Sequence, residues 1–508
     1  MNRKSKSSSA ILNSSVGILT QIVTIFTSFI VRTVFIRYLS AEYLGVNGLY
    51  SNVLSLLSLS ELGISNVMTF LLYKPLVTRD NERVLSLLKF FRKVYILIAC
   101  FVLVVGVSII PFLRVVTKSN LEQRELVSYY LLFLLGSVLS YFAVYKSIII
   151  NADQRVYVTK IVKLCANILK DALQIIVLII TKKYLFFLIV YTFTPLFENV
   201  VLTIIANHDY DFKNLNNSKM ISSEERKNIF SNVGSTFIYK IGTTVLNSTD
   251  NIIISGMIGT IIVGYYSNYV MVISALQGII SIIISSIIPI IGAINAENDK
   301  PKLERTFFLL LFIFAFINTT CTICLKDSLQ SIIFIWTKNS DYLLSERDLM
   351  LIIINFYIGN MVNPVWMYRE ACGLFKEVRY IMLFTAGANI ILSLLFCKFL
   401  GLGGIVVATG ISRMITMNWY EPKILFRKIF DKNTNRYWVR QFEYILIFSV
   451  CLIISRYLPN ISGYLMINIM VRCVLISSIS FLFYYAIFHN SNEIGTIKTI
   501  IRSKIMKR

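Results

Sequence analysis

The chain has 508 residues, of which 56% are hydrophobic and 15% are charged. Soluble domains carry about 25% charged residues, and the mean hydropathy here is +0.69. These values exclude a cytosolic enzyme, a disordered chain and a secreted disulfide scaffold. A membrane-spanning helix uses about 20 apolar residues, so the composition has room for about fourteen spans.

The net charge of +23 would suggest nucleic-acid binding in a soluble protein. Here the basic residues lie in short segments between apolar runs, and no basic stripe alternates with aromatic residues, so no nucleic-acid partner is expected. Cys321 and Cys324 have CxxC spacing, but no second pair accompanies them, and the two histidines lie far apart. Neither a metal nor another cofactor is predicted. The sequence also has no phosphate-binding P-loop, which argues against ATP hydrolysis.

Fourteen apolar runs predict an all-α polytopic membrane protein, because a helix satisfies its own backbone hydrogen bonds in lipid. The first run is retained as a span, since it is too long for a signal-peptide core. The predicted spans are residues 11–36, 46–72, 94–113, 126–150, 158–181, 184–206, 229–257, 262–291, 306–325, 348–369, 379–398, 401–421, 442–458 and 462–488.

The distribution of basic residues predicts the orientation of these spans. With the N-terminus inside, the inner segments carry about 34 Lys and Arg residues and the outer segments about 11. Basic loops stay on the cytoplasmic side of a membrane. Both termini are therefore expected in the cytoplasm, which requires an even number of spans.

Two halves of the chain resemble each other. Val16-Gly17 and Val233-Gly234 each open a span, and the related motifs 48–52 (GLYSN) and 264–268 (GYYSN) follow at a similar distance. The offsets of these pairs are 217 and 216, and Pro75 pairs with Pro289 at an offset of 214. An even number of spans separates the halves, so they share one orientation and form a parallel repeat of two six-helix lobes. The last two helices lie outside the repeat.

These landmarks predict four segments of the chain. They are an N-terminal lobe (1–210), a cytoplasmic linker (211–228), a C-terminal lobe (229–425) and two appended helices with a cytoplasmic tail (426–508).

Several motifs carry a resemblance to a known family. They are residues 38–50 (YLSAEYLGVNGLY), 60–64 (SELGI), 250–254 (DNIII) and 263–268 (VGYYSN). With the repeat, they make the chain similar to the multidrug/oligosaccharidyl-lipid/polysaccharide superfamily, and within it to bacterial polysaccharide flippases of the O-antigen and capsule type.

The resemblance implies a membrane flippase and not an enzyme. Its expected substrate is an oligosaccharide on undecaprenyl diphosphate, moved by alternating access from the inner to the outer leaflet of the bacterial plasma membrane for export of surface polysaccharide. Membrane lipids, a polysaccharide polymerase and glycosyltransferases are the expected partners. The alternatives are a multidrug cation antiporter of the same superfamily and a lipid II flippase. A membrane glycosyltransferase is a further alternative. It would need a large loop outside the membrane or a cluster of catalytic acids, and the sequence shows neither.

Charged residues inside spans are the candidate site residues, because a charge at the bilayer centre costs at least about 2.5–3.5 kcal/mol and needs a partner or water. The resemblance implies that spans 1 and 7 line a central cavity, so Arg32 and Lys240 are expected to bind the diphosphate. Arg413 and Lys170 are further candidates. Local pairing, for example of Arg32 with Glu61, is the alternative.

Four acidic residues are candidate charge partners or ion-coupling groups. They are Glu61, Asp171, Glu198 and Asp250. Asp171 is expected to point away from its neighbour Lys170, which leaves Lys170 to find a partner on another span. Arg472 lies on the last helix, outside the repeat, and is the weakest candidate for the substrate.

Overall fold

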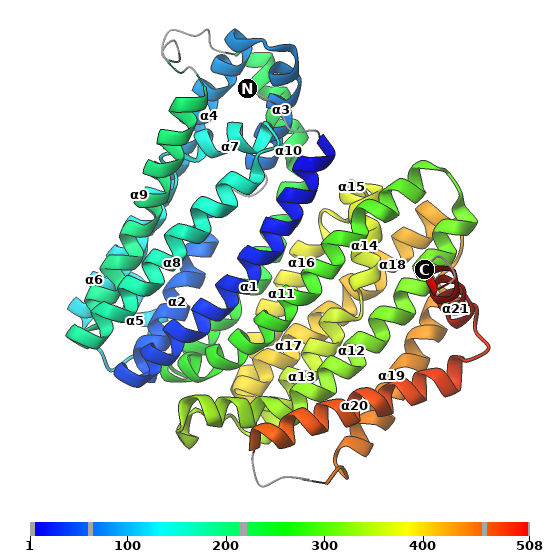
Figure 1. Cartoon of the computed structure of the whole chain (residues 1–508). Coiled ribbons are helices and arrows are strands. Elements are labelled where there is room, and N and C mark those ends of the chain that lie inside the picture. Colours follow the sequence, from blue (N-terminus) through cyan, green and yellow to red (C-terminus); the bar gives the residue numbers. More distant parts are fainter. Residues whose placement is uncertain are drawn as a thin grey trace. The chain divides into compact units, whose positions relative to one another are not determined.

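The computed structural model describes residues 6–58, 64–210, 212, 215, 221–459 and 465–505. Within these ranges every regular element is a helix, and no strand is present (Figure 1). The prediction of an all-α membrane protein is confirmed.

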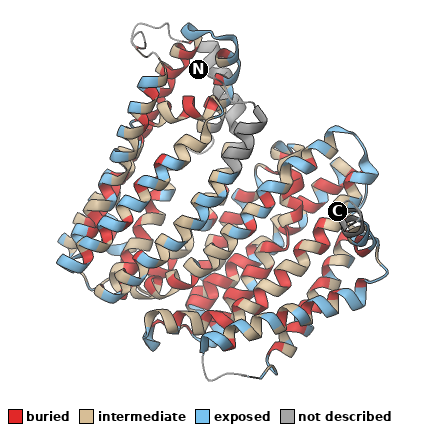
Figure 2. Cartoon of the chain, viewed as in Figure 1, coloured by how far each residue is buried: buried red, intermediate tan, exposed pale blue. Residues whose placement is uncertain are grey.

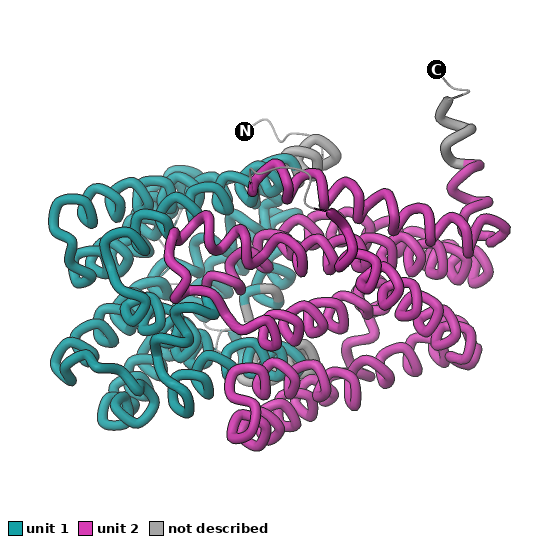
Figure 3. The backbone as a smooth tube through the Cα atoms, turned by 90° about the horizontal axis from the view of Figure 1, so that it is seen from below, with its two compact units in different colours: residues 1–267 teal, residues 268–508 magenta. Residues whose placement is uncertain are grey.

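The chain divides into two compact units, residues 1–267 and residues 268–508 (Figure 3). Unit 1 contains α1 (Lys6–Tyr38), α2 (Ala41–Leu57), α3 (Ile64–Thr78), α4 (Asn81–Ile109), η2 (Ile110–Phe112), α5 (Leu113–Val116), α6 (Gln123–Ser140), α7 (Val144–Ala152), α8 (Val156–Thr181), α9 (Tyr184–Asp209) and α10 (Ser223–Met257). Helix α11 (Thr260–Ala296) begins in unit 1 and continues in unit 2.

Unit 2 continues with α12 (Lys300–Thr337), η3 (Ser340–Tyr342), α13 (Glu346–Asn360), α14 (Asn363–Cys372), α15 (Phe375–Val378), α16 (Ile381–Leu400), α17 (Leu402–Ile415), α18 (Met417–Leu425), η4 (Phe426–Phe430), α19 (Asn435–Ser455), α20 (Leu465–Phe488) and α21 (Asn492–Ile505). The four predicted segments cut the chain at other places than these two units, and they stay a prediction.

Ten described helices are long and apolar enough to cross a membrane, or eleven if the bent pair α6 and α7 counts as one span. Every predicted span overlaps a helix or a pair of successive helices, but the number fourteen is not confirmed. Several predicted spans divide into successive helices, among them 126–150, which becomes α6 and α7, and 348–369, which becomes α13 and α14. The run 46–72 becomes α2 and α3, separated by residues outside the described ranges, and 401–421 becomes α17 and α18.

Two predicted boundaries are wrong by more than ten residues. The third span was predicted to begin at residue 94, whereas α4 begins at Asn81. The ninth span was predicted to end at residue 325, whereas α12 continues to Thr337. The continuation carries Lys326 and Asp327, and their charges are matched because Lys326 Nζ lies 2.8 Å from Asp327 Oδ1 and Arg472 of α20 lies 2.7 Å from Asp327 Oδ2. A hydropathy pattern ends at such charges, but a helix with paired charges does not have to.

Buried residues lie mostly where helices face one another (Figure 2). Many large apolar side chains are exposed. Phe26 is 68% exposed and Phe399 is 82% exposed. Exposed apolar surface on this scale is typical of a protein that is surrounded by lipid.

The backbone repeats itself at an offset of 219 residues. Three non-glycine residues of unit 1 with positive φ are Arg79 (57°), Gln154 (62°) and Lys182 (53°). Residues 219 positions later also have positive φ, and they are Asn298 (56°), Gly373 (72°) and Gly401 (58°). The aspartates that follow the first pair, Asp80 and Asp299, both cap the next helix by accepting a backbone N–H. The backbone pattern therefore repeats, with a register 2 to 5 residues longer than the sequence motifs indicated, and the parallel orientation of the two lobes stays a prediction.

Candidate functional site

Unit 1 contains a polar cavity of about 550 Å³ between four of its apolar helices. Its walls come from α3, the bent pair α6 and α7, α8 and α9. The lining polar residues are Ser65, Thr69, Ser140, Ser147, Asn151, Lys163, Asn167, Lys170, Tyr191, Thr194, Glu198 and Asn199. Two of the predicted site residues, Lys170 and Glu198, therefore face the same cavity.

Helix α8 supplies the cationic wall of the cavity. Lys163, Asn167 and Lys170 follow one another at spacings of four and three residues, which places them on one face of the helix. Gln174, four residues further on, is buried. Lys163 is not among the predicted site residues, because it is the last residue of the basic inner segment that leads into this span. The 3.6-residue periodicity of polar residues through the span was the signal that could have found it.

The prediction that Lys170 takes its partner from another span is wrong. Lys170 Nζ lies 3.1 Å from Oδ1 of its neighbour Asp171, and the Asp171 side chain is 10% exposed. A flexible lysine stem can fold back along its own helix to an adjacent carboxylate. Lys163 forms no ion pair with any described residue, although its charge acts on Glu198.

Most hydroxyl groups of the cavity are already bonded to the helices that carry them. Thr194 donates to Val190 O, and Ser147 donates to Val144 O. The amides are engaged as well, since Asn199 donates to Leu139 O at 2.7 Å and Asn151 accepts from Thr159 at 2.8 Å. Oxygen lone pairs remain on these groups. Together with the Lys163 ammonium, they can bind hydroxyl and anionic groups of a ligand.

Arg32 and Lys240, the main predicted diphosphate ligands, lie on different helices of unit 1. Arg32 is half-buried on α1, which packs along α8, and its charge acts on Tyr184. Lys240 is half-buried on α10, which packs along α2, and its ammonium has no ion-pair partner in the described part of the chain. Their joint action on one diphosphate stays a prediction.

Arg413 lies in unit 2 on α17, a helix that packs on α13. Its guanidinium stands over Gly359, and a Cβ atom added to Gly359 would lie 2.7 Å from Nη1. A side chain at position 359 would therefore require the guanidinium to shift. The role of Arg413 with the substrate stays a prediction.

The remaining predicted residues have different surroundings. Asp250 is half-buried on α10, and Glu61 lies outside the described residues. Arg472 donates to Asp327 and to the carbonyl oxygens of Ser455 and Leu458, so it joins α20 to α12 and α19. This full set of acceptors gives Arg472 a structural role.

Two glycines bring α2 and α11 into contact at one end of unit 1. A Cβ on Gly45 would lie 1.9 Å from Thr260 O, and a Cβ on Gly264 would lie 2.1 Å from Ala41 O. Ala41 and Thr260 are the first residues of the two helices. Each helix thus places a glycine against the first carbonyl of the other, a close approach that only glycine permits.

Side-chain and loop contacts reinforce this end. Glu42 accepts hydrogen bonds from the Ser119 hydroxyl at 2.6 Å and the Asn120 backbone N–H at 2.5 Å. Lys118 donates to Met257 O at 2.9 Å and accepts from the Thr260 backbone N–H at 3.1 Å. The loop after α5 therefore connects the start of α2 with the corner between α10 and α11.

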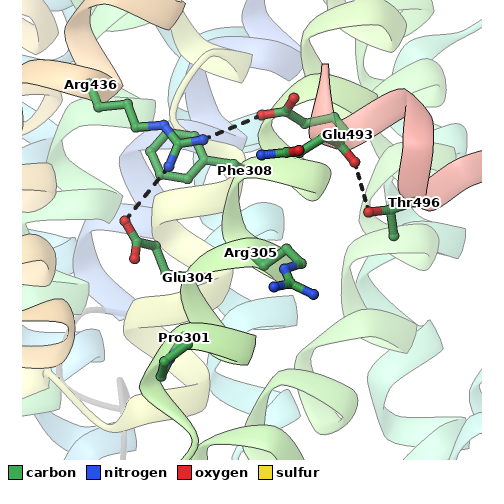
Figure 4. A pocket seen from close by; sticks show the side chains of 8 residues that line it. Pro301, Glu304, Arg305, Phe308, Arg436, Glu493 and Thr496 are labelled. Atoms are coloured by element: carbon green, nitrogen blue, oxygen red, sulfur yellow. Dashed lines mark hydrogen bonds and ion pairs between the residues drawn. The ribbon is translucent and has the colours of Figure 1, made fainter. Parts of the chain in front are cut away.

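A smaller pocket of about 250 Å³ lies in unit 2 between α12, α19 and α21 (Figure 4). Arg436 lies between two carboxylates, 4.0 Å from Glu304 and 3.8 Å from Glu493, and 4.0 Å from the centre of the Phe308 ring (Figure 4). Because these charges pair with one another, the pocket serves to anchor α21 to the unit.

Comparison with known proteins places this fold among membrane transporters. The model of a family described as polysaccharide biosynthesis protein matches residues 11–295. No curated protein matches the chain.

Three solved structures illustrate the similarity. The inward closed lipid II flippase MurJ has 14% identity and a TM-score of 0.68, over 94% of this chain and 99% of that one. The MATE multidrug transporter DinF-BH has 16% identity and a TM-score of 0.61, over 85% and 99%. An inward-facing multidrug resistance MATE family transporter of the MOP superfamily has 16% identity and a TM-score of 0.58, over 80% and 95%. At these identities the likeness shows the fold.

Proposed function

We propose, from the premise that this chain belongs to the polysaccharide biosynthesis protein family, that it moves an oligosaccharide linked to undecaprenyl diphosphate across the bacterial plasma membrane. The chain is a multi-pass membrane protein with a transporter fold. In this proposal it performs no covalent chemistry, both termini lie in the cytoplasm, and the polymerase and glycosyltransferases are its partners.

The observation that carries the proposal is the polar cavity of unit 1. Polar and charged side chains that line a cavity between apolar helices are typical of a substrate or ion path, because such groups are costly to place in lipid. Lys163 and Lys170 offer positive charge, and Asn151, Asn167 and Asn199 offer amide groups to sugar hydroxyls. This chemistry suits the head group, while the prenyl chain stays in lipid.

Transport in this proposal alternates access to the head group between the two sides of the membrane. The contact of α2 with α11 closes one end of unit 1. Under the proposed orientation, this end faces the outside of the cell. Opening it separates Gly45 from Thr260 and Gly264 from Ala41. The membrane potential, negative inside, favours outward movement of an anion by about 2.3 kcal/mol per charge at 100 mV, which gives about 5 kcal/mol for two charges. Glu198 or Asp250 could instead bind a coupled cation.

A multidrug cation antiporter would use carboxylates that face an otherwise neutral cavity. In the cavity of unit 1, Glu198 shares the lining with Lys163 and with Lys170, which pairs with Asp171, so this carboxylate does not face an otherwise neutral cavity. The fold of the lipid II flippase is similar, so lipid II is the competing substrate.

The test is the surface polysaccharide of a strain that lacks the gene. Deletion should abolish the polysaccharide and cause lipid-linked oligosaccharide to accumulate. The double variant Lys163→Gln with Lys170→Gln should not restore export, whereas Lys93→Gln, an exposed lysine of α4, should restore it at equal protein level. Normal export by the double variant would overturn the role of the cavity. A cell that cannot grow without the gene would favour lipid II.

A further inference from the structure

A second pocket of unit 1, of about 400 Å³, lies at the end where α1 and α8 finish and α2, α6 and α9 begin. Its lining combines three cationic side chains with three tyrosines and one carboxylate. These residues are Arg124, Lys182, Lys183, Tyr43, Tyr129, Tyr184 and Glu125. None of them lines the polar cavity described above.

The three tyrosines form one wall of this pocket. Their ring centres lie 4.9 Å apart for Tyr129 and Tyr184, 5.2 Å for Tyr43 and Tyr184, and 6.2 Å for Tyr43 and Tyr129. Tyr184 is almost fully buried, and its hydroxyl donates to Asn47 at 3.2 Å. Tyr129 donates to Glu125 at 3.3 Å. The wall is therefore fixed, and the one carboxylate already accepts a hydrogen bond.

The cations, by contrast, are not engaged. Within the described ranges, no hydrogen bond or ion pair reaches the side chains of Arg124, Lys182 or Lys183, and all three side chains are exposed. Three unpaired cations beside one carboxylate give the pocket a positive potential, which attracts anions from solution or from a lipid surface.

The turn that carries the lysines holds Lys182 in the left-handed region, with a φ of 53° and a ψ of 24°. Lys338 at the end of α12 has nearly the same conformation, with a φ of 51° and a ψ of 26°. Glycine adopts this conformation without strain. Replacing Lys182 by glycine therefore removes its charge from the pocket and keeps the turn.

We propose that this pocket binds the phosphate group of a membrane lipid. Its residues lie where the candidate spans Ser15–Tyr38 and Val156–Thr181 end and Tyr184–Asp209 begins, which is the level of lipid head groups. Lysine and arginine bind phosphate through charge-assisted hydrogen bonds. The phosphate belongs either to an anionic phospholipid of the bilayer or to the polyprenyl carrier, and both sources offer the same group to the three cations.

The test measures lipid binding to the purified full chain in detergent by native mass spectrometry. The probes are phosphatidylglycerol, undecaprenyl diphosphate and diacylglycerol, which has no phosphate. The test variant is Lys182→Gly with Lys183→Gln, because glycine readily adopts the left-handed conformation of Lys182. The control is Lys338→Gly, an exposed lysine with a φ of 51° at the end of α12 that lies outside the pocket.

We expect the double variant to bind a phosphate-bearing probe roughly 10- to 30-fold more weakly than the unchanged protein, since each lysine near a membrane contributes about 1 kcal/mol, whereas Lys338→Gly binds normally. A loss confined to phosphatidylglycerol assigns the pocket to bilayer lipid, and a loss confined to undecaprenyl diphosphate assigns it to the carrier. Unchanged binding of both probes, an equal loss in the control, or equally strong binding of diacylglycerol would overturn the proposal.

Discussion

Gly45 and Gly264 occupy equivalent places in the repeat, 219 residues apart, and each faces the carbonyl oxygen of the other helix's first residue. The α2–α11 contact is thus symmetric in its construction. Because neither glycine carries a side chain, the two helices can approach closely. They can also separate without breaking a hydrogen bond between Gly45 and Gly264. Such a contact suits the end of unit 1 that opens in the proposed transport cycle.

Alanine at Gly45 or Gly264 should prevent this close approach, because the added Cβ would meet a backbone oxygen at about 2 Å. Forcing extra atoms into a packed contact costs about 1–3 kcal/mol. We expect a lower unfolding temperature in detergent and reduced export of polysaccharide. Gly48→Ala is the matched control one turn along α2, since its nearest neighbour would lie at 3.5 Å. Equal effects at Gly45 and Gly48 would contradict this explanation.

Glu42→Gln should loosen the loop at residues 117–120. The carboxylate accepts two hydrogen bonds there, and bonds to a charged group contribute about 1.5–3 kcal/mol. Amide hydrogen exchange of the peptide that contains Asn120 should become faster. Glu122→Gln is the control, because the side chain of Glu122 makes no capping bond in the same loop region. Unchanged exchange in Glu42→Gln would mean that the loop is held by its backbone contacts alone.

Arg413 and Gly359 should show a suppressor relationship. Gly359→Ala places a methyl group 2.7 Å from the Arg413 guanidinium, so the single variant should unfold at a lower temperature. Adding Arg413→Ala removes the clash and should restore part of the stability. If Arg413 also binds substrate, export stays low in the double variant although the protein is stable. Gly387→Ala, where nothing lies within 4 Å of the new atom, should have no effect.

Replacement of Arg32 and Lys240 by alanine should abolish surface polysaccharide while protein levels remain normal, if both bind the diphosphate. Each charge compensates part of an anion in a medium of low dielectric. The measurement is surface polysaccharide by immunoblot, with membrane protein quantified in parallel. Normal polysaccharide from the double variant would remove both residues from the substrate path.

The buried pair of Arg369 and Glu421 should be necessary for stability. Arg369 donates to both carboxylate oxygens of Glu421, at 2.9 and 3.0 Å, and both side chains are at most 2% exposed. Removing Glu421 leaves Arg369 with Glu370 still at 2.9 Å, so the cost is at most about 3–5 kcal/mol, the cost of a fully broken buried pair. Glu421→Gln should therefore lower the amount of folded protein. The double variant Arg369→Met with Glu421→Gln should recover part of the loss, and a larger loss in the double variant would contradict the pairing.

Hydropathy predicted the helices well because lipid imposes one simple rule on long segments: their backbone must bond internally and their surface must be apolar. The same rule says little about contacts between helices. The partner of Lys170 is its neighbour Asp171, which depends on how a flexible side chain folds. The cavity needed α3, α7, α8 and α9 to be placed together, and no periodicity in one span reveals that.

The repeat shows the same limit. The related motifs GLYSN and GYYSN aligned Gly48 with Gly264. The backbone conformation and the close approach of α2 to α11 instead align Gly45 with Gly264. The structure constrains a glycine where helices pack closely and constrains a turn through its φ angle. In apolar sequence, identical residue types also match by chance. An alignment based on such matches can therefore differ from the structural register by a few residues.

The pairing of Arg369 with Glu421 also orders events during synthesis. The two residues are 52 positions apart, and a ribosome that adds 5–20 residues per second needs roughly 3–10 s to make that stretch. Until Glu421 has been made, the neighbouring Glu370, which also pairs with Arg369 in the folded protein, is the carboxylate at hand for the guanidinium. Helix α14 can therefore complete its buried ion pair only after α18 has been made.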